Sequence, residues 1–366
     1  MKYRIPAAVF LAAALLSSLA FSGNGFRDVL DTPATKSPLA QKTLFNGIVS
    51  AGKRLVSVGQ RGHIVYSDDA GKNWTQATVP VTSDLTAVTF PTAQQGWAVG
   101  QDGVVLHSAD AGATWTKQFD GRAAAQVMTT HHKALKNCSS CHDNMDATKE
   151  TVPGEEPVMM VEIKSMVEKG PDKSFLDVWF ENETTGFIVG AFNLIFRTVD
   201  GGKTWEPWFD RTDNKKRLHL YAIRSVGQEL FIAGEQGLVM KLDKPSGQFR
   251  ALKVPYNGTF FGLTGKPGSV IAFGMRGNAF RSTNGGTSWE KIETGIPLGL
   301  IGSLITTDGK IVLVSQAGHL LVSRDDGATF IPAKLEQPFP AAAIVGVDNE
   351  NVVLAGMHGM QKQILK

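Results

Sequence analysis

The chain has 366 residues, of which 42% are hydrophobic and 19% are charged, a balance that supplies a large apolar core and excludes an intrinsically disordered protein. Its 39 glycines and 16 prolines favour many short strands joined by turns over long helices. The formal net charge of +3 falls to +1 without the first twenty residues, which carry Lys2 and Arg4 and no acid. Such a small charge argues against a nucleic-acid-binding protein.

The first twenty residues have the pattern of a secretory signal peptide. Lys2 and Arg4 precede an apolar run from Ala7 to Ala20, which ends in a small-x-small cleavage pattern. The run is shorter than the roughly 20 residues that span a bilayer, and no cysteine follows it to carry a lipid. We therefore expect a protein exported to a periplasm or lumen by a cleaved leader, with no membrane or lipid anchor.

A phrase of the form S-x-D-x-G-x-T-W returns along the chain. Clear copies begin at Ser67, Ser108 and Thr198, and weaker copies begin at Ser282 and Ser323. The aromatic residue that ends each unit recurs at intervals of 41, 90, 44, 40 and 41 residues, at Trp74, Trp115, Trp205, Phe249, Trp289 and Phe330. A period of roughly 40 to 45 residues is typical of propeller blades, so the long interval contains an insertion of about 49 residues.

Each unit contains three short β runs and a fourth that begins with the aromatic residue, which makes one four-stranded propeller blade. The first strands begin at Leu44, Leu85, Phe175, Leu220, Phe260, Leu300 and Ile344. The sequence therefore predicts an all-β fold, a seven-bladed β-propeller over residues 44–366. The last unit ends after the run from Gln361 to Leu365, so we expect residues 38–43, within an N-terminal segment of residues 21–43, to supply its missing strand and close the ring.

Residues 121–173 depart from the repeat. The stretches from Arg122 to Leu135 and from Val158 to Val167 have the apolar periodicity of helices. We therefore expect a helical insertion between blades 2 and 3, lying over the face that carries the connections between blades. Insertions of this kind often form lids or partner-binding arms.

The repeated phrase resembles the Asp-box of BNR-repeat propellers. The longer pattern from Gly96 to Trp115, GWAVG-x-x-G followed by a strand and an Asp-box, is similar to the photosystem II assembly and stability factor family. The resemblance covers residues 44–366 without the insertion. It implies a lumenal or periplasmic seven-bladed scaffold that helps a membrane complex to assemble.

Loops alternate between the two faces of an antiparallel blade, which places the Asp-boxes on one face and the G-x-x-G turns and blade connections on the other. The residues before the second turn glycine are expected to form a ring near the central opening; they are Arg61, Asp102, Asn193, Gln236, Arg276, Ala317 and His358.

Two of these turn residues, Arg61 and Arg276, are candidates to bind a carboxylate or phosphate of a partner. A basic connection adds four candidate partner-binding residues on the same face, Arg211, Lys215, Lys216 and Arg217. The alternative interpretation is that these are ordinary polar turn residues and a solvated loop.

Cys138, Cys141 and His142 form C-x-x-C-H, the attachment pattern of haem c, in which both thiols bind the haem and the imidazole ligates iron. Met145, Met159 or Met160 would supply the second axial ligand, with His131 and His132 as competitors. The resemblance does not imply haem. A redox-active disulfide and a metal site formed by both cysteines, His142 and His131 are alternatives.

No phosphate-binding glycine loop, G-x-S-x-G elbow or H-E-x-x-H motif is present, so we expect no enzyme activity. The favoured function is a monomeric, non-catalytic scaffold for a membrane-associated protein complex. One alternative is a haem-bearing electron-transfer accessory. Another is a sialidase-like glycosidase. Resemblance to that class would imply three arginines around the substrate carboxylate, a Tyr-Glu nucleophile pair and an Asp acid. The only tyrosines after the leader that could serve as the nucleophile are Tyr66, Tyr221 and Tyr256.

Overall fold

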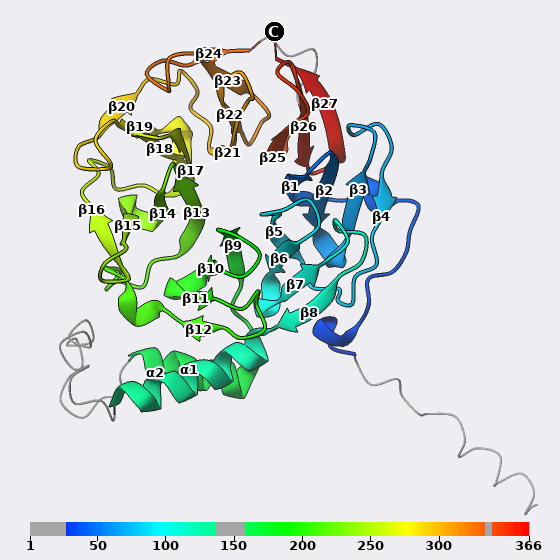
Figure 1. The fold of residues 1–366 in the computed structure, drawn as a ribbon, viewed down its shortest axis with the longest axis vertical. Helices are drawn as coiled ribbons and strands as arrows, with labels where there is room; N and C mark the ends of the chain where they lie inside the picture. Colours follow the sequence, from blue (N-terminus) through cyan, green and yellow to red (C-terminus); the bar gives the residue numbers. More distant parts are fainter. Residues whose placement is uncertain (1–26, 137–157, 334–338, 366) are drawn as a thin grey trace, which may run out of the picture.

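The structure is a computed structural model that describes residues 27–136, 158–333 and 339–365. Seven antiparallel sheets are arranged around a central axis, as Figure 1 shows from above the ring. The prediction of an all-β, seven-bladed propeller is therefore confirmed.

The strands of each blade run in order from the axis to the rim. Blade 1 consists of β1 (Phe45–Ala51), β2 (Arg54–Gly59), β3 (Ile64–Ser67) and β4 (Thr75–Gln76). Blade 2 consists of β5 (Leu85–Thr89), β6 (Gly96–Gly100), β7 (Val105–Ser108) and β8 (Thr116–Phe119). Blade 3 consists of β9 (Phe175–Phe180), β10 (Gly186–Gly190), β11 (Ile195–Thr198) and β12 (Glu206–Pro207). Blades 4 and 5 consist of β13 (Leu220–Val226), β14 (Glu229–Gly234), β15 (Val239–Asp243), β16 (Gln248–Leu252); and β17 (Phe260–Lys266), β18 (Ser269–Gly274), β19 (Ala279–Ser282), β20 (Glu290–Ile292). Blades 6 and 7 consist of β21 (Leu300–Ile305), β22 (Ile311–Ser315), β23 (Leu320–Ser323), β24 (Ile331–Pro332); and β25 (Ala341–Gly346), β26 (Asn351–Gly356), β27 (Gly359–Ile364).

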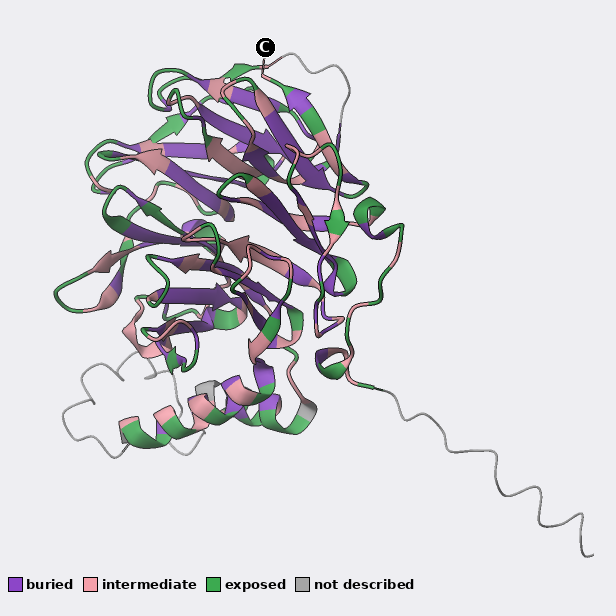
Figure 2. Cartoon of the chain, turned by 45° about the vertical axis from the view of Figure 1, so that its right-hand side comes forward, coloured by how far each residue is buried: buried purple, intermediate pink, exposed green. Residues whose placement is uncertain are grey.

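Short 3-10 turns precede β1 or lie in the connections between strands. They span Val29–Asp31, Ala40–Lys42, Gln60–Gly62, Gln101–Gly103, Ala191–Asn193, Phe209–Arg211, Glu235–Gly237 and Met275–Gly277. The second strand of a blade packs between neighbouring sheets, and β6 is buried along its whole length. Figure 2 shows this buried inner layer, with exposed residues concentrated in the loops and at the rim.

The Asp-box sequence produces a compact turn between the third and fourth strands. Ser108 Oγ donates to Asp110 Oδ1 at 2.8 Å and accepts the Gly112 N–H at 2.9 Å. Gly112 has a φ of 84°, a left-handed conformation that favours glycine. Trp115 is buried between blades and donates its indole N–H to the Gly112 carbonyl at 2.9 Å. The repeated phrase is therefore a structural device that sets the spacing of the blades.

The prediction of how the ring closes is wrong. In the described residues the seventh sheet has three strands, and Ala40–Lys42 forms a 3-10 turn that contacts β27 without joining its sheet. Upstream residues are held on the first blade instead, because Ala34 donates its N–H to the Val79 carbonyl at 3.0 Å and Ser37 donates its N–H to Gln76 Oε1 at 2.9 Å. The few residues left before β1 lie beside the start of β27, but Ala40–Lys42 form a 3-10 turn rather than a strand.

The insertion contributes two helices, α1 (Gly121–Lys136) and α2 (Val158–Lys169), which pack against each other. They bury Ala125 and Met128 of α1 and Ile163 and Met166 of α2 in a core shared with Phe175. No helix in the described ranges combines the length and hydropathy of a bilayer-spanning segment.

The predicted helical insertion between blades 2 and 3 is confirmed, but its predicted position is wrong. Figures 1 and 2 place both helices outside the ring, next to β12, and α1 also contacts the Gln101–Gly103 turn, so the insertion lies beside the edge of the face with the turns rather than over it. The helices lie there because their apolar sides complete the core between blades 2 and 3.

Candidate functional site

The two faces of the propeller separate the Asp-boxes from the G-x-x-G turns. On one face, Ala111 of an Asp-box donates its N–H to the carbonyl of Gln94, in the loop between the first and second strands, at 3.0 Å. On the other, Arg61 of a turn donates its backbone N–H to Asp84 Oδ1 at 2.8 Å, just before β5. The predicted separation of the arginine turns from the Asp-boxes is therefore correct. We call the second surface the turn face.

Arg61 and Arg276 occupy equivalent turns in blades 1 and 5, and both side chains are exposed. Their backbones have φ angles of 54° and 55°, so each turn holds a non-glycine residue in the left-handed region. Next to Arg276, the Met275 N–H donates to the Thr259 carbonyl at 2.9 Å, which fixes this turn on the connection before β17. The turn face thus presents two exposed guanidinium groups on rigid turns.

The sequence assignment of Asn193 is corrected by one position. Asn193 has a φ of 64° and replaces the second glycine of its turn, whereas Phe192, with a φ of 54°, is the counterpart of Arg61. Asn193 is buried, and its Nδ2 donates to the Phe209 carbonyl at 3.2 Å and to Thr212 Oγ1 at 3.0 Å. It therefore holds the next connection in place rather than facing a partner.

Apolar side chains on the same turns were missed by the sequence analysis. Phe192, Met275 and Met357 are 41%, 39% and 60% exposed. The predicted ring contained only the residue assigned to the position before each second glycine. The residue one position earlier, apolar in M-R-G and M-H-G, carried the missing signal. The turn face therefore combines cationic and apolar groups, as protein-binding surfaces do.

The structure places the residues of the basic connection between blades 3 and 4 on two different surfaces. Lys215 and Lys216 are exposed, and Lys216 Nζ donates to Gln236 Oε1 at 3.1 Å, which places it beside the turn of blade 4. Arg217 has a φ of 55° in the same connection. These residues extend the turn face from blade 4.

The predicted position of Arg211 on the turn face is wrong. Its guanidinium stacks on the Trp208 ring, 3.8 Å from the ring centroid, and Nη2 donates to Glu206 Oε1 at 3.1 Å. These contacts draw the side chain back along the blade, where it lines a cavity together with residues 244–247 of the loop that replaces the Asp-box in blade 4.

A central cavity of about 570 Å³ is lined by the inner strands of all seven blades. None of the seven turn residues predicted to surround the opening lines it, because each turn joins the second and third strands, one or two strands away from the axis. The expectation that they border the central opening is corrected accordingly.

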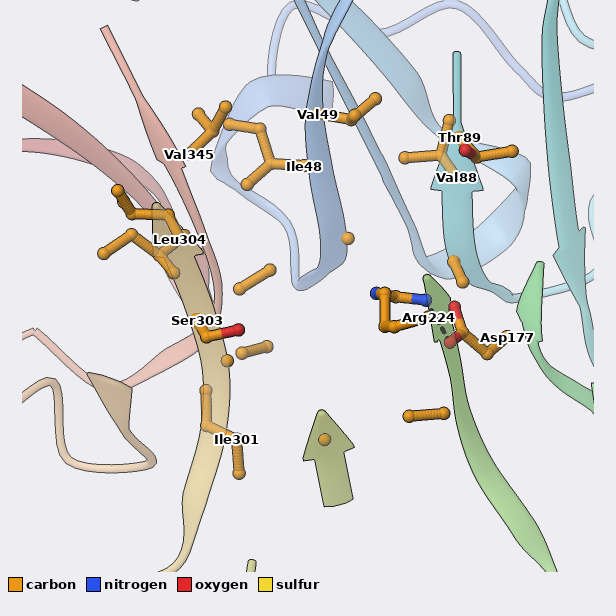
Figure 3. A pocket seen from close by; sticks show the side chains of 18 of the residues that line it. Ile48, Val49, Val88, Thr89, Asp177, Arg224, Ile301, Ser303, Leu304 and Val345 are labelled. Carbon is orange, nitrogen blue, oxygen red and sulfur yellow. Dashed lines mark hydrogen bonds and ion pairs between the residues drawn. The ribbon is translucent and has the colours of Figure 1, made fainter. Parts of the chain in front are cut away.

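Asp177 and Arg224 form an ion pair at the wall of this cavity, shown in Figure 3. Asp177 is 3% exposed and also accepts the Ile223 N–H at 2.7 Å, so it links the inner strands of blades 3 and 4. Burial raises the pKa of Asp177, and the Arg224 guanidinium opposes that shift. The sequence analysis missed this pair, although charged residues inside the apolar strands FLDVWF and LYAIRSV were a signal.

The central cavity does not support the glycosidase alternative. Tyr221 lines it, as a catalytic tyrosine would, but Arg224 is the single arginine among the described lining residues. A sialidase-like site would need three arginines around the substrate carboxylate. Arg224 is already bonded to Asp177.

The insertion is attached to the propeller through His131. His131 Nε2 lies 3.1 Å from Asp210 Oδ1 in the connection between blades 3 and 4, and its ring meets Phe209 edge-on at 5.5 Å. The candidate haem residues Cys138, Cys141, His142 and Met145 lie outside the described residues. Within the described ranges, no group of three or more His, Cys, Asp or Glu residues is arranged to hold a metal.

Comparison with known proteins identifies a family. The family model described as "Photosynthesis system II assembly factor YCF48" matches residues 45–122 and 157–296, more than half of the chain. The photosystem II assembly lipoprotein Ycf48 of Synechococcus sp. (strain CC9902) is 30% identical over 159 residues, which cover 42% of this chain and 47% of that protein. The chain spans about half the length of the curated relatives it matches.

Solved structures share the fold. One described as "YCF48 bound to D1 peptide" matches with a TM-score of 0.59 and 15% identity, covering 89% of this chain and 94% of that one. YCF48 from Cyanidioschyzon merolae matches with a TM-score of 0.58 and 14% identity, covering 90% and 98%. At these identities the likeness establishes the propeller architecture.

Proposed function

Because the chain belongs to the family described as photosynthesis system II assembly factor YCF48, we propose that it is a non-catalytic scaffold that binds a segment of a membrane-associated protein during assembly. A solved relative is described as bound to a D1 peptide, which supports a peptide segment as the form of the ligand. The propeller provides the rigid platform, and a loop face provides the contacts.

The observation that carries the proposal is the composition of the turn face. Arg61 and Arg276 supply exposed charges, and Phe192, Met275 and Met357 supply exposed apolar groups on equivalent turns. Buried apolar anchors surrounded by charged contacts are the usual source of affinity at protein interfaces. The proposed ligand is therefore a segment that carries both carboxylates and apolar side chains.

The basic connection extends this surface. Lys215, Lys216 and Arg217 belong to the proposed docking surface through the contact between Lys216 and the turn of blade 4. Arg211 does not, because it is bonded to Glu206 and stacked on Trp208.

The test is recovery of client protein from solubilised membranes of the native host. The double variant Arg61→Gln/Arg276→Gln should recover about tenfold less of the membrane protein that the unaltered chain captures, because charge-assisted contacts are lost. Arg324→Gln is the matched control, since Arg324 is an exposed arginine on the Asp-box face. Equal recovery by the double variant and the control would refute the docking surface.

We also propose export by a cleaved leader at residues 1–20, which lie outside the described residues. The curated relatives are named lipoproteins, which supports a location outside the cytoplasm for this family. Intact-mass measurement of the exported protein should give a chain that begins near residue 21; a mass that includes the leader would contradict cleavage.

The C-x-x-C-H sequence supports a second candidate function, covalent attachment of haem c at Cys138, Cys141 and His142. Bound haem would be attached through the thiols of Cys138 and Cys141, with the His142 imidazole as an iron ligand, and would supply one-electron transfer. Absorbance in the Soret region and a denatured mass increased by one haem test it. A colourless protein of unmodified mass would exclude haem.

A further inference from the structure

The fourth blade lacks an Asp-box, and a residue of the third blade compensates. Its third and fourth strands are joined by residues 244–247, which do not follow the S-x-D-x-G pattern. Trp208, from the preceding connection, donates its indole N–H to the Gly247 carbonyl at 3.0 Å. The box tryptophans make the same kind of bond to their own glycine carbonyl, as Trp289 does to Gly286 at 3.0 Å.

The missing box also removes the partner of a cation in the third blade. In two other blades, the third residue of the third strand is basic. Its side chain donates a hydrogen bond to the Asp-box backbone of the next blade. Lys241 Nζ donates to the Gly285 carbonyl at 3.0 Å, and Arg281 Nε donates to the Asp326 carbonyl at 2.9 Å. These bonds close the gap between neighbouring blades.

Arg197 occupies the same position in blade 3, where no box follows. Its guanidinium lies 5.0 Å from the Trp208 ring centroid and 5.9 Å from that of Phe187. Across the described residues, Arg197 makes no hydrogen bond or ion pair. Glu206, its cross-strand neighbour, bonds instead to Arg211. Arg197 therefore retains a full set of donors beside two aromatic rings.

Arg197 lines a cavity of about 790 Å³ between blades 3 and 4. The ionisable side chains that line it are Arg197, Arg211, Lys244, Glu181 and Glu229. Glu229 is bonded to Lys241 at 3.0 Å and Arg211 to Glu206 at 3.1 Å, which leaves Arg197 and Lys244 against Glu181. Half-buried Trp179 provides apolar wall area next to these cations, whereas Trp208 is buried beneath the Arg211 guanidinium.

We propose that this cavity binds an acidic segment of a partner protein, with a carboxylate on Arg197 and an adjacent apolar side chain against Trp179. A guanidinium donates two parallel hydrogen bonds to a carboxylate, and aromatic walls bury the apolar neighbour. The site is distinct from the turn face, because its walls include the loop that replaces an Asp-box. Its binding does not depend on the proposed client.

The probe is the peptide acetyl-Glu-Phe-Glu-amide, titrated against the purified chain while the indole N–H resonance of Trp208 is followed by NMR. The acidic peptide should shift this resonance in a saturable manner. Acetyl-Gln-Phe-Gln-amide should bind at least tenfold more weakly, because the neutral amides lose the charge-assisted bonds. Equal affinities of the two peptides would overturn the proposal.

Two arginine variants complete the test. Arg197→Gln should weaken binding of the acidic peptide about tenfold, whereas Arg281→Gln should leave it unchanged, because Arg281 holds the same strand position but is bonded to the protein. Equal effects of the two substitutions, with both variants folded by circular dichroism, would refute the site. If free glutarate shows the Arg197 dependence and the peptide does not, the assignment to a protein segment is wrong.

Discussion

At the scale of single residues, the Asp-box carboxylates are held by hydrogen bonds that favour their charged form. Asp69 accepts the Asn73 N–H at 2.8 Å and the Asn73 side chain at 2.6 Å, and these bonds lower its pKa from 3.8 to about 2. In blade 6, the Thr329 hydroxyl and N–H likewise lower the pKa of Asp325 to about 2. The stability that the box turns contribute to the fold therefore depends on pH through their aspartates.

We expect the free energy of unfolding to decrease as the pH falls from about 4 to about 2. A lowered pKa in the folded state means that the unfolded chain binds more protons in this window, so stability is lost on acidification. Asp69→Asn/Asp325→Asn should reduce this pH dependence without disrupting the turns, because Asn284 makes the same backbone bond in blade 5. Urea titrations at several pH values measure the free energy of unfolding. The same dependence of that free energy on pH in the double variant as in the unaltered chain would contradict the role of these aspartates.

The ion pair at the central cavity, in which Asp177 is buried and Arg224 is exposed, gives a second prediction at this scale. Asp177→Ala leaves the Ile223 N–H without its acceptor and removes the counter-charge of Arg224. Because the Arg224 side chain is 47% exposed and stays solvated, the main cost is the unpaired Ile223 N–H, about 1–3 kcal/mol of unfolding free energy. Chemical denaturation measures the loss. A cost below about 1 kcal/mol would show that this pair does not hold blades 3 and 4 together.

At the scale of elements, the insertion is part of the propeller core rather than a loose appendage. Ile163 of α2 is 1% exposed and packs in the cluster that includes Phe175 and Trp205. Val161, two residues earlier, is 53% exposed. The two positions offer a matched comparison of buried and exposed aliphatic side chains on one helix.

Ile163→Ala should lower the free energy of unfolding by about 2–5 kcal/mol, since it leaves a cavity between the helix and blades 2 and 3. Val161→Ala should change it by less than about 0.5 kcal/mol. Differential scanning calorimetry of both variants measures the difference. Similar melting temperatures would mean that α2 does not contribute to the core.

Some elements were predictable from the sequence because their causes are local. The Asp-box can be recognised in sequence because Ser108, Asp110 and Gly112 bond within one turn, and its spacing then gives the number of blades. The position of the insertion was not predictable, since the core it completes comes from two blades. The absence of a fourth strand in blade 7 was not predictable. The N-terminal segment is held on blade 1 by contacts such as the hydrogen bond from Ser37 to Gln76, which no local pattern reveals.

At the scale of the whole molecule, the closed ring assigns the loops to two surfaces with different chemistry. Alternation of loops predicted which face carries Arg61 and Arg276, and the bond from Arg61 to Asp84 confirms it. Arg211 was misplaced because its ring stacking and ion pair act through space. The apolar turn residues Phe192 and Met357 were not predicted, because the prediction used the turn position one residue later.

The central claim is that the turn face, and not the Asp-box face, contacts the membrane-associated client. Site-specific photo-crosslinking in the native host tests it most directly, with the photoreactive residue placed at Arg276 or, as the control, at Arg324. We predict a crosslink to one membrane protein from position 276 and none to that protein from position 324. A crosslink to the same protein from position 324 alone would contradict the account.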